Sequence, residues 1–545
     1  MTGPERSTLG DDFLPQTVSV FRQGYKLGDL RADAIAGLTV AIVALPLSMA
    51  IAIASGVGPE RGLYTAIIGG FLVSLLGGSR FQVGGPAGAF IVLVSAAVMQ
   101  IGLSGLILAT FLSGFMLIAV GALRLGNYIK FIPFPVTVGF TAGIAVIIMA
   151  SQLRDFMGLQ TGGAEPAEIL PKLVAIWDAR ATFDLVTAAL AVATVALILG
   201  LRKYRPGWPG MLIAVALGAT LAALGLPVET ISERFGELPR VLPAPALPAL
   251  ELDLLRAALP FAVAFALLGA IESLLSAVVA DGMTGQRHRS NAELVGQGVA
   301  NIGSSIFGGF CVTGTIARTA TNVRSGSHGP VSGMLHAVFL LVFLLIAAPL
   351  AGYIPLAALA GLLMVVAWNM IEKEEFLSLL RVSRADAAVL LVTFLLVVFR
   401  DLTEGIIAGT ALGGAVFIRR MSEAARIEPV LPEPAYDPAS QKSGVVVYRL
   451  RGAYFFGAAA TLAKTLDRVA EQPHVLVVDF SNVPFVDTSG AHSFATLAAK
   501  LARQNCTLVI SGAQPEIRKV LRSQLRHYKN IRYRPTIDAA LEDFG

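Results

Sequence analysis

Two charged residues lie inside stretches of sequence that are otherwise apolar enough to be buried in a membrane. Glu272 lies within the run FAVAFALLGAIESLLSAVVA, and Arg318 follows the short run TGTIA at 313–317. Ionisable residues in such segments are costly and usually serve ion pathways or substrate sites. A carboxylate at Glu272 could carry a proton or bind a sodium ion, and a guanidinium at Arg318 would attract an anion. The alternative is structural: an ion pair between the two, or an Arg318 side chain that reaches the membrane surface.

The run TGTIA has a counterpart in the first half of the chain, VGGPAG at 83–88. Each run opens an apolar stretch that is too short to cross a bilayer as an unbroken helix, which needs about 20 residues. A helix that begins inside the membrane leaves its first N–H groups unpaired and carries about half a positive charge at that end. Two such ends that face one another would bind an anion. Small residues also permit close helix packing in membranes, which is the alternative explanation for each run.

The residue types within the two runs fit such a site. Gly84, Gly85 and Gly88 would let a ligand approach the backbone, and Pro86 suits a first helical turn. Thr315 could cap the second half-helix or offer its hydroxyl to the ligand. Gly269 and Ser276 lie one turn on either side of Glu272, so that face of its helix is small and leaves room for a site.

The composition predicts a protein that resides in lipid. The chain has 545 residues, of which 55% are hydrophobic and only 14% charged, whereas soluble domains have about a quarter charged residues. The N-terminal segment lacks the pattern of a removable signal. Two cysteines, Cys311 and Cys506, and six dispersed histidines indicate neither a disulfide framework nor a metal site. The net charge of +5 is explained by membrane orientation rather than by nucleic-acid binding.

The apolar runs predict seven membrane spans in each half of the chain. The first set covers residues 36–56, 60–78, 86–101, 104–123, 131–152, 183–201 and 209–226. The second set covers residues 258–280, 291–309, 315–324, 329–350, 353–370, 385–399 and 402–418. The third and tenth spans are the short ones, at corresponding positions. Because seven is odd, the second set must enter from the opposite side, which is typical of inverted-repeat transporters.

The distribution of basic residues predicts that both termini are cytoplasmic, in an inner or plasma membrane. Cytoplasmic loops carry an excess of Lys and Arg. The N-terminal segment carries such residues, and so do most loops after even-numbered spans: Arg80; Arg124 and Lys130; Arg202, Lys203 and Arg205; Arg287 and Arg289; Arg381 and Arg384; Arg419 and Arg420.

A small α/β domain is predicted after a proline-rich linker. The runs VVVYRL, VLVVDF and TLVISG are typical of strands, and the segments between them of helices that cover a sheet. We predict four parts: a cytoplasmic N-terminal segment at 1–30, a transport domain at 31–421, a linker at 422–442 and the α/β domain at 443–545. No set of residues that would form an enzyme's active site is visible in the tail.

The sequence resembles the SulP anion permeases. The strongest match is DGMTGQRHRSNAELVGQGVANIGSSIFGGF at 281–310, and ALPLSMAIAIASGVGPERGLYTAIIGGF at 44–71 also matches. The C-terminal region resembles the STAS domain of these permeases. The resemblance implies a transporter, not an enzyme, with no cofactor. It implies an α-helical membrane protein of 14 transmembrane segments in a 7+7 inverted repeat with core and gate domains, elevator-like movement and a homodimer.

The resemblance also implies which residues face the ligand, a small inorganic or carboxylate anion. They are Ala87, Gly88 and Phe90 on the third span, with Thr315, Ile316, Ala317 and Arg318 on the tenth. Glu272 falls where bacterial members place their acidic coupling residue. Thr488 falls where related STAS domains carry a phosphorylated hydroxyl, and the tail is expected to serve structure or bind a cytoplasmic protein partner.

Several alternatives for substrate and coupling stay open. Leu47, where many sulfate-type members have glutamine, favours the bicarbonate and dicarboxylate branch over sulfate. Glutamate rather than aspartate at position 272 favours a co-transported proton over sodium. The other candidates are a sodium-coupled bicarbonate symporter, an anion channel, a nucleobase permease on the same fold and a membrane-anchored signalling scaffold. Sulfate, bicarbonate and dicarboxylates all stay open as substrates, and so do symport and exchange.

Overall fold

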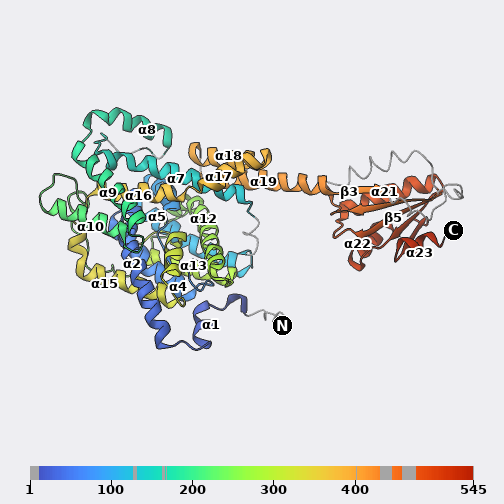
Figure 1. Cartoon of the computed structure of the whole chain (residues 1–545), viewed down its shortest axis with the longest axis horizontal. Helices are drawn as coiled ribbons and strands as arrows, with labels where there is room; N and C mark the ends of the chain where they lie inside the picture. The colour runs from blue at the N-terminus through green and yellow to red at the C-terminus, as the bar shows by residue number, and fades with distance from the viewer. Residues whose placement is uncertain are drawn as a thin grey trace. The chain divides into compact units, whose positions relative to one another are not determined.

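The structure is a computed structural model that describes residues 11–126, 132–162, 166, 168–400, 402–429, 445–456 and 474–543. It divides into two compact units, Met1–Thr410 and Ala411–Gly545. The first unit is built almost entirely of helices, and the second contains a β-sheet (Figure 1).

The helices of the first half of the chain alternate between long apolar segments and short connecting ones. They are α1 (Gln16–Arg22), α2 (Leu27–Ala54), α3 (Pro59–Tyr64), α4 (Gly70–Leu76), α5 (Ile91–Ala122), α7 (Phe134–Met157), α8 (Ile169–Asp178), α9 (Leu185–Tyr204), α10 (Gly210–Ala223) and α11 (Ile231–Phe235). Shorter turns are η1 (Asp11–Phe13), the π-helical η2 (Thr65–Gly69) that joins α3 to α4, η3 (Gly88–Phe90) and η4 (Ala179–Thr182).

The second half follows the same plan. Its helices are α12 (Leu252–Thr284), α13 (Ser290–Ile306), α14 (Ile316–Arg324), α15 (Val331–Ala351), α16 (Leu356–Met370), α17 (Lys373–Val382), α18 (Arg384–Phe399) and α19 (Leu402–Ala424). A two-residue strand stands at each predicted interruption: β1 (Gly84–Gly85) before η3 and the long helix α5, and β2 (Thr313–Gly314) before the short helix α14.

The helices have the length and composition that a bilayer requires. Among the described residues, 8 are long and apolar enough to cross a membrane. Each of the predicted spans overlaps a helix, while α8 and α17 lie between predicted spans. The fold is thus a mostly helical membrane fold, and the number of fourteen spans stays a prediction.

Small residues allow the helices to pack with their backbones close together. Gly114 of α5 faces Gly298 of α13, and a Cβ added at either would lie 2.5–2.6 Å from the other's carbonyl oxygen. Gly37 of α2 lies equally close to Ser332 of α15, since its added Cβ would lie 2.5 Å from the Ser332 carbonyl oxygen. Such contacts are how helices associate in lipid, where no hydrophobic effect drives them together.

The second unit contains a five-stranded sheet covered by helices on both faces. The strands β3 (Arg426–Pro429), β4 (Val445–Arg451), β5 (Val475–Asn482), β6 (Thr507–Ser511) and β7 (Ile531–Arg534) pair in sequence order. Only β3 pairs antiparallel to its neighbour. The helices are α21 (Thr488–Arg503), α22 (Pro515–Leu525) and α23 (Ile537–Leu541).

The alternation of side chains along the strands explains the two faces. Leu476, Val478 and Ile510 pack in one cluster with residues of α21 and α22, whereas Val477 and Val509 pack in another with Ala540 of α23. The three predicted strands are confirmed as β4, β5 and β6. The strands β3 and β7 were not predicted, and β3 lies within the predicted linker. Residues 430–442 of that linker, and Lys130, are outside the described part of the chain.

Gly102 joins the predicted third and fourth spans and offers a test of this fold. It has φ 68° and ψ −179° inside the continuous run of α5, a conformation essentially restricted to glycine. We expect Gly102→Ala to destabilise the protein by about 1–3 kcal/mol and to lower its melting temperature in detergent. In the control, Gly200→Ala in α9, the added Cβ meets nothing within 4 Å and should not lower it. Equal melting of the two variants would contradict this conformation.

Candidate functional site

The two interrupted spans meet at β1 and β2. The strands pair antiparallel, with Gly84 opposite Gly314 and Gly85 opposite Thr313. The Thr315 N–H extends the ladder by donating to the Val83 carbonyl at 3.1 Å. Because a helix begins within three residues of the end of each strand, the N-termini of η3 and α14 start from the same short ladder. The structure therefore brings the two predicted runs together.

The predicted ligand-facing residues of the first half surround the start of η3. Ala87 and Phe90 are buried and Gly88 is partly exposed. The Phe90 ring packs edge-on against Phe265 of α12, with centroids 6.0 Å apart. A Cβ added to Gly88 would lie 3.3 Å from Ile148 Cδ1 of α7 and 3.6 Å from Met370 Sδ of α16. The start of η3 thus faces an apolar wall formed by two other helices.

The predicted residues of the second half begin α14. Thr315 is the N-cap residue, but its side chain accepts no capping bond; its hydroxyl donates instead to the Val83 carbonyl at 3.3 Å. The first N–H groups of α14, including those of Ile316 and Ala317, have no carbonyl one turn earlier to pair with. Ala317 is exposed and Ile316 partly so. The positive end of α14 is therefore accessible at this position.

Arg318 lies beneath the ladder rather than in the open. The residue is 1% exposed. One terminal nitrogen, Nη2, donates to Ser48 Oγ of α2 at 3.0 Å and to the Pro86 carbonyl at 3.3 Å, and Nη1 donates to the Gly84 carbonyl at 3.4 Å. Its Nε has no partner among the described residues. The guanidinium therefore supports the backbone of β1 and adds positive charge behind the half-helix ends.

Glu272 lies on α12 beside both interrupted spans. One turn earlier, the Gly269 carbonyl accepts a hydrogen bond from Thr313 Oγ1 at 3.2 Å. One turn later, Ser276 Oγ donates to Thr319 Oγ1 of α14 at 3.1 Å. Glu272 itself is 7% exposed and, within the described part of the chain, makes no hydrogen bond or ion pair. The alternative of a structural ion pair between Glu272 and Arg318 is thus not what the structure shows.

Glu293 is a second buried carboxylate near the ladder, and it was not among the predicted site residues. It is fully buried on α13 and accepts hydrogen bonds from Ser79 N at 2.9 Å, Gln82 Nε2 at 2.6 Å and Ser273 Oγ at 3.0 Å. Gln82 immediately precedes the ladder region, so Glu293 fixes the approach to β1 against α12. The available signal was a lone carboxylate inside an apolar, glycine-rich span.

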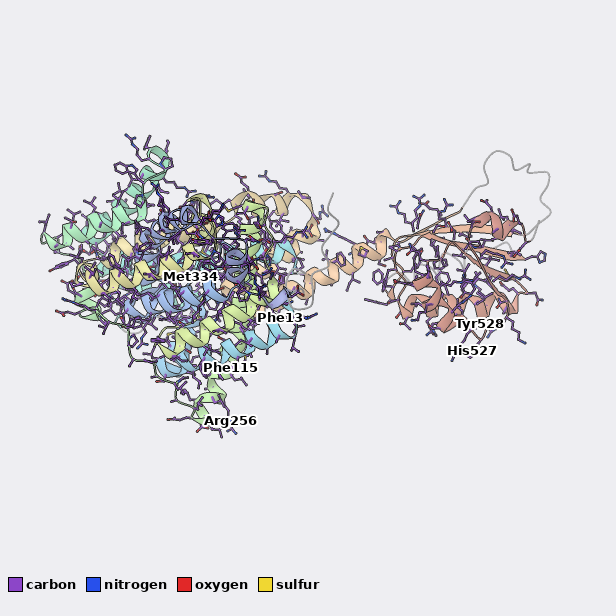
Figure 2. The ribbon with its side chains drawn as sticks, turned by 90° about the horizontal axis from the view of Figure 1, so that it is seen from below. Phe13, Phe115, Arg256, Met334, His527 and Tyr528 are labelled. Carbon is purple, nitrogen blue, oxygen red and sulfur yellow. The ribbon has the colours of Figure 1, made fainter. Side chains whose placement is uncertain are left out.

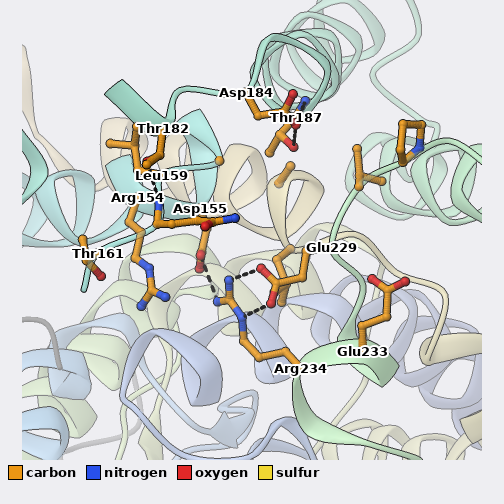
Figure 3. Close-up of a pocket in the computed structure, with 16 residues that line it drawn as sticks. Arg154, Asp155, Leu159, Thr161, Thr182, Asp184, Thr187, Glu229, Glu233 and Arg234 are labelled. Carbon is orange, nitrogen blue, oxygen red and sulfur yellow. Dashed lines mark hydrogen bonds and ion pairs between the residues drawn. The ribbon is translucent and has the colours of Figure 1, made fainter. Parts of the chain in front are cut away.

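A separate polar pocket lies among α7, α9, α11 and α16 (Figure 3). Its volume is about 590 Å³, and Arg234 at its centre pairs with Asp155 at 2.9 Å and with Glu229 at 2.8 Å. The hydrogen bonds from Arg234 lower the pKa of Glu229. The pocket contains none of the predicted site residues. The ion pairs of Arg234 link α11 to the end of α7 and to the loop that precedes α11.

Thr488 of the second unit is exposed at the first position of α21. The preceding residue, Asp487, caps this helix by accepting a hydrogen bond from Gly490 N at 2.6 Å, and it also accepts one from Phe456 N at 3.2 Å. The Thr488 hydroxyl is therefore accessible at the positive end of a helix.

Comparisons with known proteins match two family models to this chain. The model of the sulfate permease family matches residues 30–393, and the STAS domain model matches residues 438–540. The chain is 42% identical over 503 residues to the putative sulfate transporter YvdB of Bacillus subtilis, covering 92% of this chain and 94% of that protein. It is 30% identical over 527 residues to the bicarbonate transporter BicA of Picosynechococcus sp., covering 92% of each.

Two solved structures share the fold. The transmembrane domain of a cyanobacterial bicarbonate transporter BicA superposes with a TM-score of 0.62 at 33% identity, covering 71% of this chain and 98% of that one. The murine Solute Carrier 26 family member A9 anion transporter, in its inward-facing state, gives a TM-score of 0.84 at 17% identity and covers 99% of this chain and 96% of that one.

Gly85 tests whether the position of Arg318 matters for the site. A Cβ added to Gly85 would lie 1.8 Å from Arg318 Nη1, so Gly85→Ala must displace the guanidinium. We expect the concentration of transported anion for half-maximal uptake to rise about tenfold, equivalent to about 1.4 kcal/mol. Gly282→Ala in α12 is the control, since its Cβ meets nothing within 4 Å. Equal half-saturation in the two variants would show that the Arg318 position is irrelevant.

Proposed function

The chain belongs to the sulfate permease family, and on that premise we propose that it is a secondary active transporter of sulfate, bicarbonate or a small dicarboxylate. It is a multi-pass integral membrane protein and an anion transporter, not an enzyme. The observation that carries the proposal is the ladder of β1 and β2. It places two half-helix N-termini together above the buried charge of Arg318, and such ends bind anions.

We assign the anion to the residues around the two helix starts. The backbone N–H groups near Gly88 and those of Ile316 and Ala317 would donate to its oxygens, because no carbonyl one turn earlier takes them. Ala87, Phe90 and Thr315 shape the walls, with Arg318 supplying charge from beneath. A site formed mostly from backbone and small side chains suits compact anions, which have many acceptor oxygens and little apolar surface.

Glu272 is assigned to coupling with a proton. Its carboxylate is nearly buried, has no hydrogen-bond partner in the described part of the chain and lies on the helix that contacts both β2 and α14. Protonation would remove the energetic cost of burying that negative charge. It would also remove a negative charge close to the site where the anion binds. The alternative is a sodium ion, as in a sodium-coupled bicarbonate symporter, for which further oxygen ligands would have to gather around Glu272.

The transport movement is proposed to be elevator-like. The start of η3 meets α7 and α16 through the apolar side chains of Ile148 and Met370. Contacts of this kind have no fixed hydrogen-bond register, so one group of helices can slide along the other by a shear movement. The anion would then travel with the ladder while α7 and α16 stay in place.

The remaining assignments concern the membrane and the tail. We propose that both termini are cytoplasmic in an inner or plasma membrane, that the protein forms a homodimer, and that the STAS domain binds a cytoplasmic protein. Phosphorylation of Thr488 would place a phosphate at the N-terminus of α21, where the helix dipole favours negative charge.

Uptake into proteoliposomes tests substrate and coupling together. Labelled bicarbonate, sulfate and fumarate are offered under an imposed proton or sodium gradient to the native chain and to Glu272→Gln. We expect one anion to accumulate only with an inward proton gradient, and Glu272→Gln to abolish the accumulation. Glu251→Gln is the control, because Glu251 is exposed at the N-cap of the same helix.

Three outcomes would contradict this reading. Accumulation driven by sodium alone would replace proton coupling with sodium coupling. Current without accumulation would indicate a channel. Nucleobase uptake without anion uptake would mean that the fold serves another substrate.

A further inference from the structure

The second unit carries a strong concentration of positive charge on α22 and the strand that follows it. Residues 515–534 contain seven arginines and lysines and a single acidic residue, Glu516. The basic residues are Arg518, Lys519, Arg522, Arg526, Lys529, Arg532 and Arg534.

Three of the arginines form one row, which we call the arginine stripe: Arg518, Arg522 and Arg526. Residues four apart are neighbours on a helix surface, so the three guanidinium groups follow one face of α22 into its C-cap. Arg522 and Arg526 are exposed, and no ion pair neutralises any of the three within the described part of the chain. Figure 2 labels His527 and Tyr528 in the turn that continues from the stripe.

The stripe rests on the edge strand β7. The guanidinium carbons of Arg518 and Arg522 each lie 5.1 Å from the centroid of the Tyr533 ring. Stacking on an aromatic ring leaves the N–H edges of a guanidinium available to other groups. Arg518 and Arg522 are therefore held from one side. Arg526 is held differently, because its Nε donates to His527 Nε2 at 3.1 Å. The exposed parts of Arg522 and Arg526 remain open to a partner.

Two polar atoms beneath the stripe lack partners. Arg518 Nε and the Tyr533 hydroxyl are both buried and make no hydrogen bond within the described part of the chain. Burial raises the pKa of Tyr533, so its hydroxyl remains a donor at neutral pH. Unsatisfied buried donors are uncommon in folded proteins. Both lie on the buried side of the stripe, so the groups that meet a partner at the surface are the exposed guanidinium groups of Arg522 and Arg526.

The short connection to α19 favours a lipid surface as the partner of the arginine stripe. The strand β3 begins at Arg426, directly after α19 ends at Ala424, and α19 is long and apolar enough to cross a membrane. A domain on so short a connection remains at high effective concentration near the lipid surface. Each arginine close to anionic headgroups adds to the affinity of the protein for the membrane, and this contribution decreases as the salt concentration rises.

We propose that the arginine stripe docks the STAS domain on anionic phospholipid headgroups of the membrane that the chain spans. The partner is a lipid surface, recognised through its phosphates and net negative charge. Docking would restrict how the domain moves about its connection to α19. This inference does not depend on which anion is transported or on how transport is coupled.

Hydrogen exchange of the full-length chain in lipid nanodiscs tests the proposal. We compare discs of phosphatidylcholine with discs that also contain phosphatidylglycerol and follow the amides of residues 515–534. Anionic discs should slow exchange there by about fivefold or more, since each arginine near such a surface contributes about fivefold in affinity. High salt should remove the effect. Arg522→Gln/Arg526→Gln should remove most of it.

The matched control is Lys500→Gln/Arg503→Gln, which removes two charges from exposed positions of α21 and should leave the slowing intact. Equal exchange of the native chain in both kinds of disc would overturn the proposal. So would slowing that soluble heparin produces and lipid does not, because the partner would then be a soluble polyanion. If the control lost as much of the slowing of hydrogen exchange as the stripe variant, the slowing would depend on net charge and not on the arginine stripe, which would also overturn the proposal. Anion uptake, measured in parallel, reports separately on the transport proposal.

Discussion

The antiparallel ladder of β1 and β2 is the constraint on which the candidate site depends. In a bilayer every backbone N–H and C=O must find a partner within the protein, so a membrane span can be interrupted only where another segment satisfies it. Here each interruption satisfies the other: Gly84 and Gly85 pair with Gly314 and Thr313. Because the ladder uses the backbone groups just before the helices, the first N–H groups of those helices remain available to an anion.

The surrounding polar residues can be understood as supports for this ladder. Arg318 donates to the carbonyls of Gly84 and Pro86, Thr319 accepts from Val83 N, and Glu293 holds Gln82. Each contact joins a residue of one half of the chain to the other half. Glu272 differs from these supports because no described group pairs with it. Of the two buried carboxylates near the ladder, the one without partners is the one to which we assign proton coupling.

The sequence was informative where the membrane imposes a simple rule. Apolar length located the helices, and two short spans with small residues located the interruptions, because only glycine permits a backbone as close as that of Gly85 to Arg318. The direction of the Arg318 side chain was not predictable, because a guanidinium can donate hydrogen bonds equally well to a ligand and to backbone carbonyls. The role of Glu293 depends on Ser79 and Gln82, more than two hundred residues away in the chain. The strands β3 and β7 were missed because Pro429 and the charged run IRYR are atypical of strands.

The central claim, that the anion binds at the start of α14, can be tested by chemical modification of one position. The native cysteines, Cys311 and Cys506, are both buried, so Ala317→Cys introduces a single exposed thiol at the proposed site. We predict that the transported anion slows alkylation of this thiol in a saturable way and leaves unchanged the rate at Ala257→Cys, an exposed position on α12. Alkylation at position 317 that the anion does not slow would contradict the account and place the anion elsewhere.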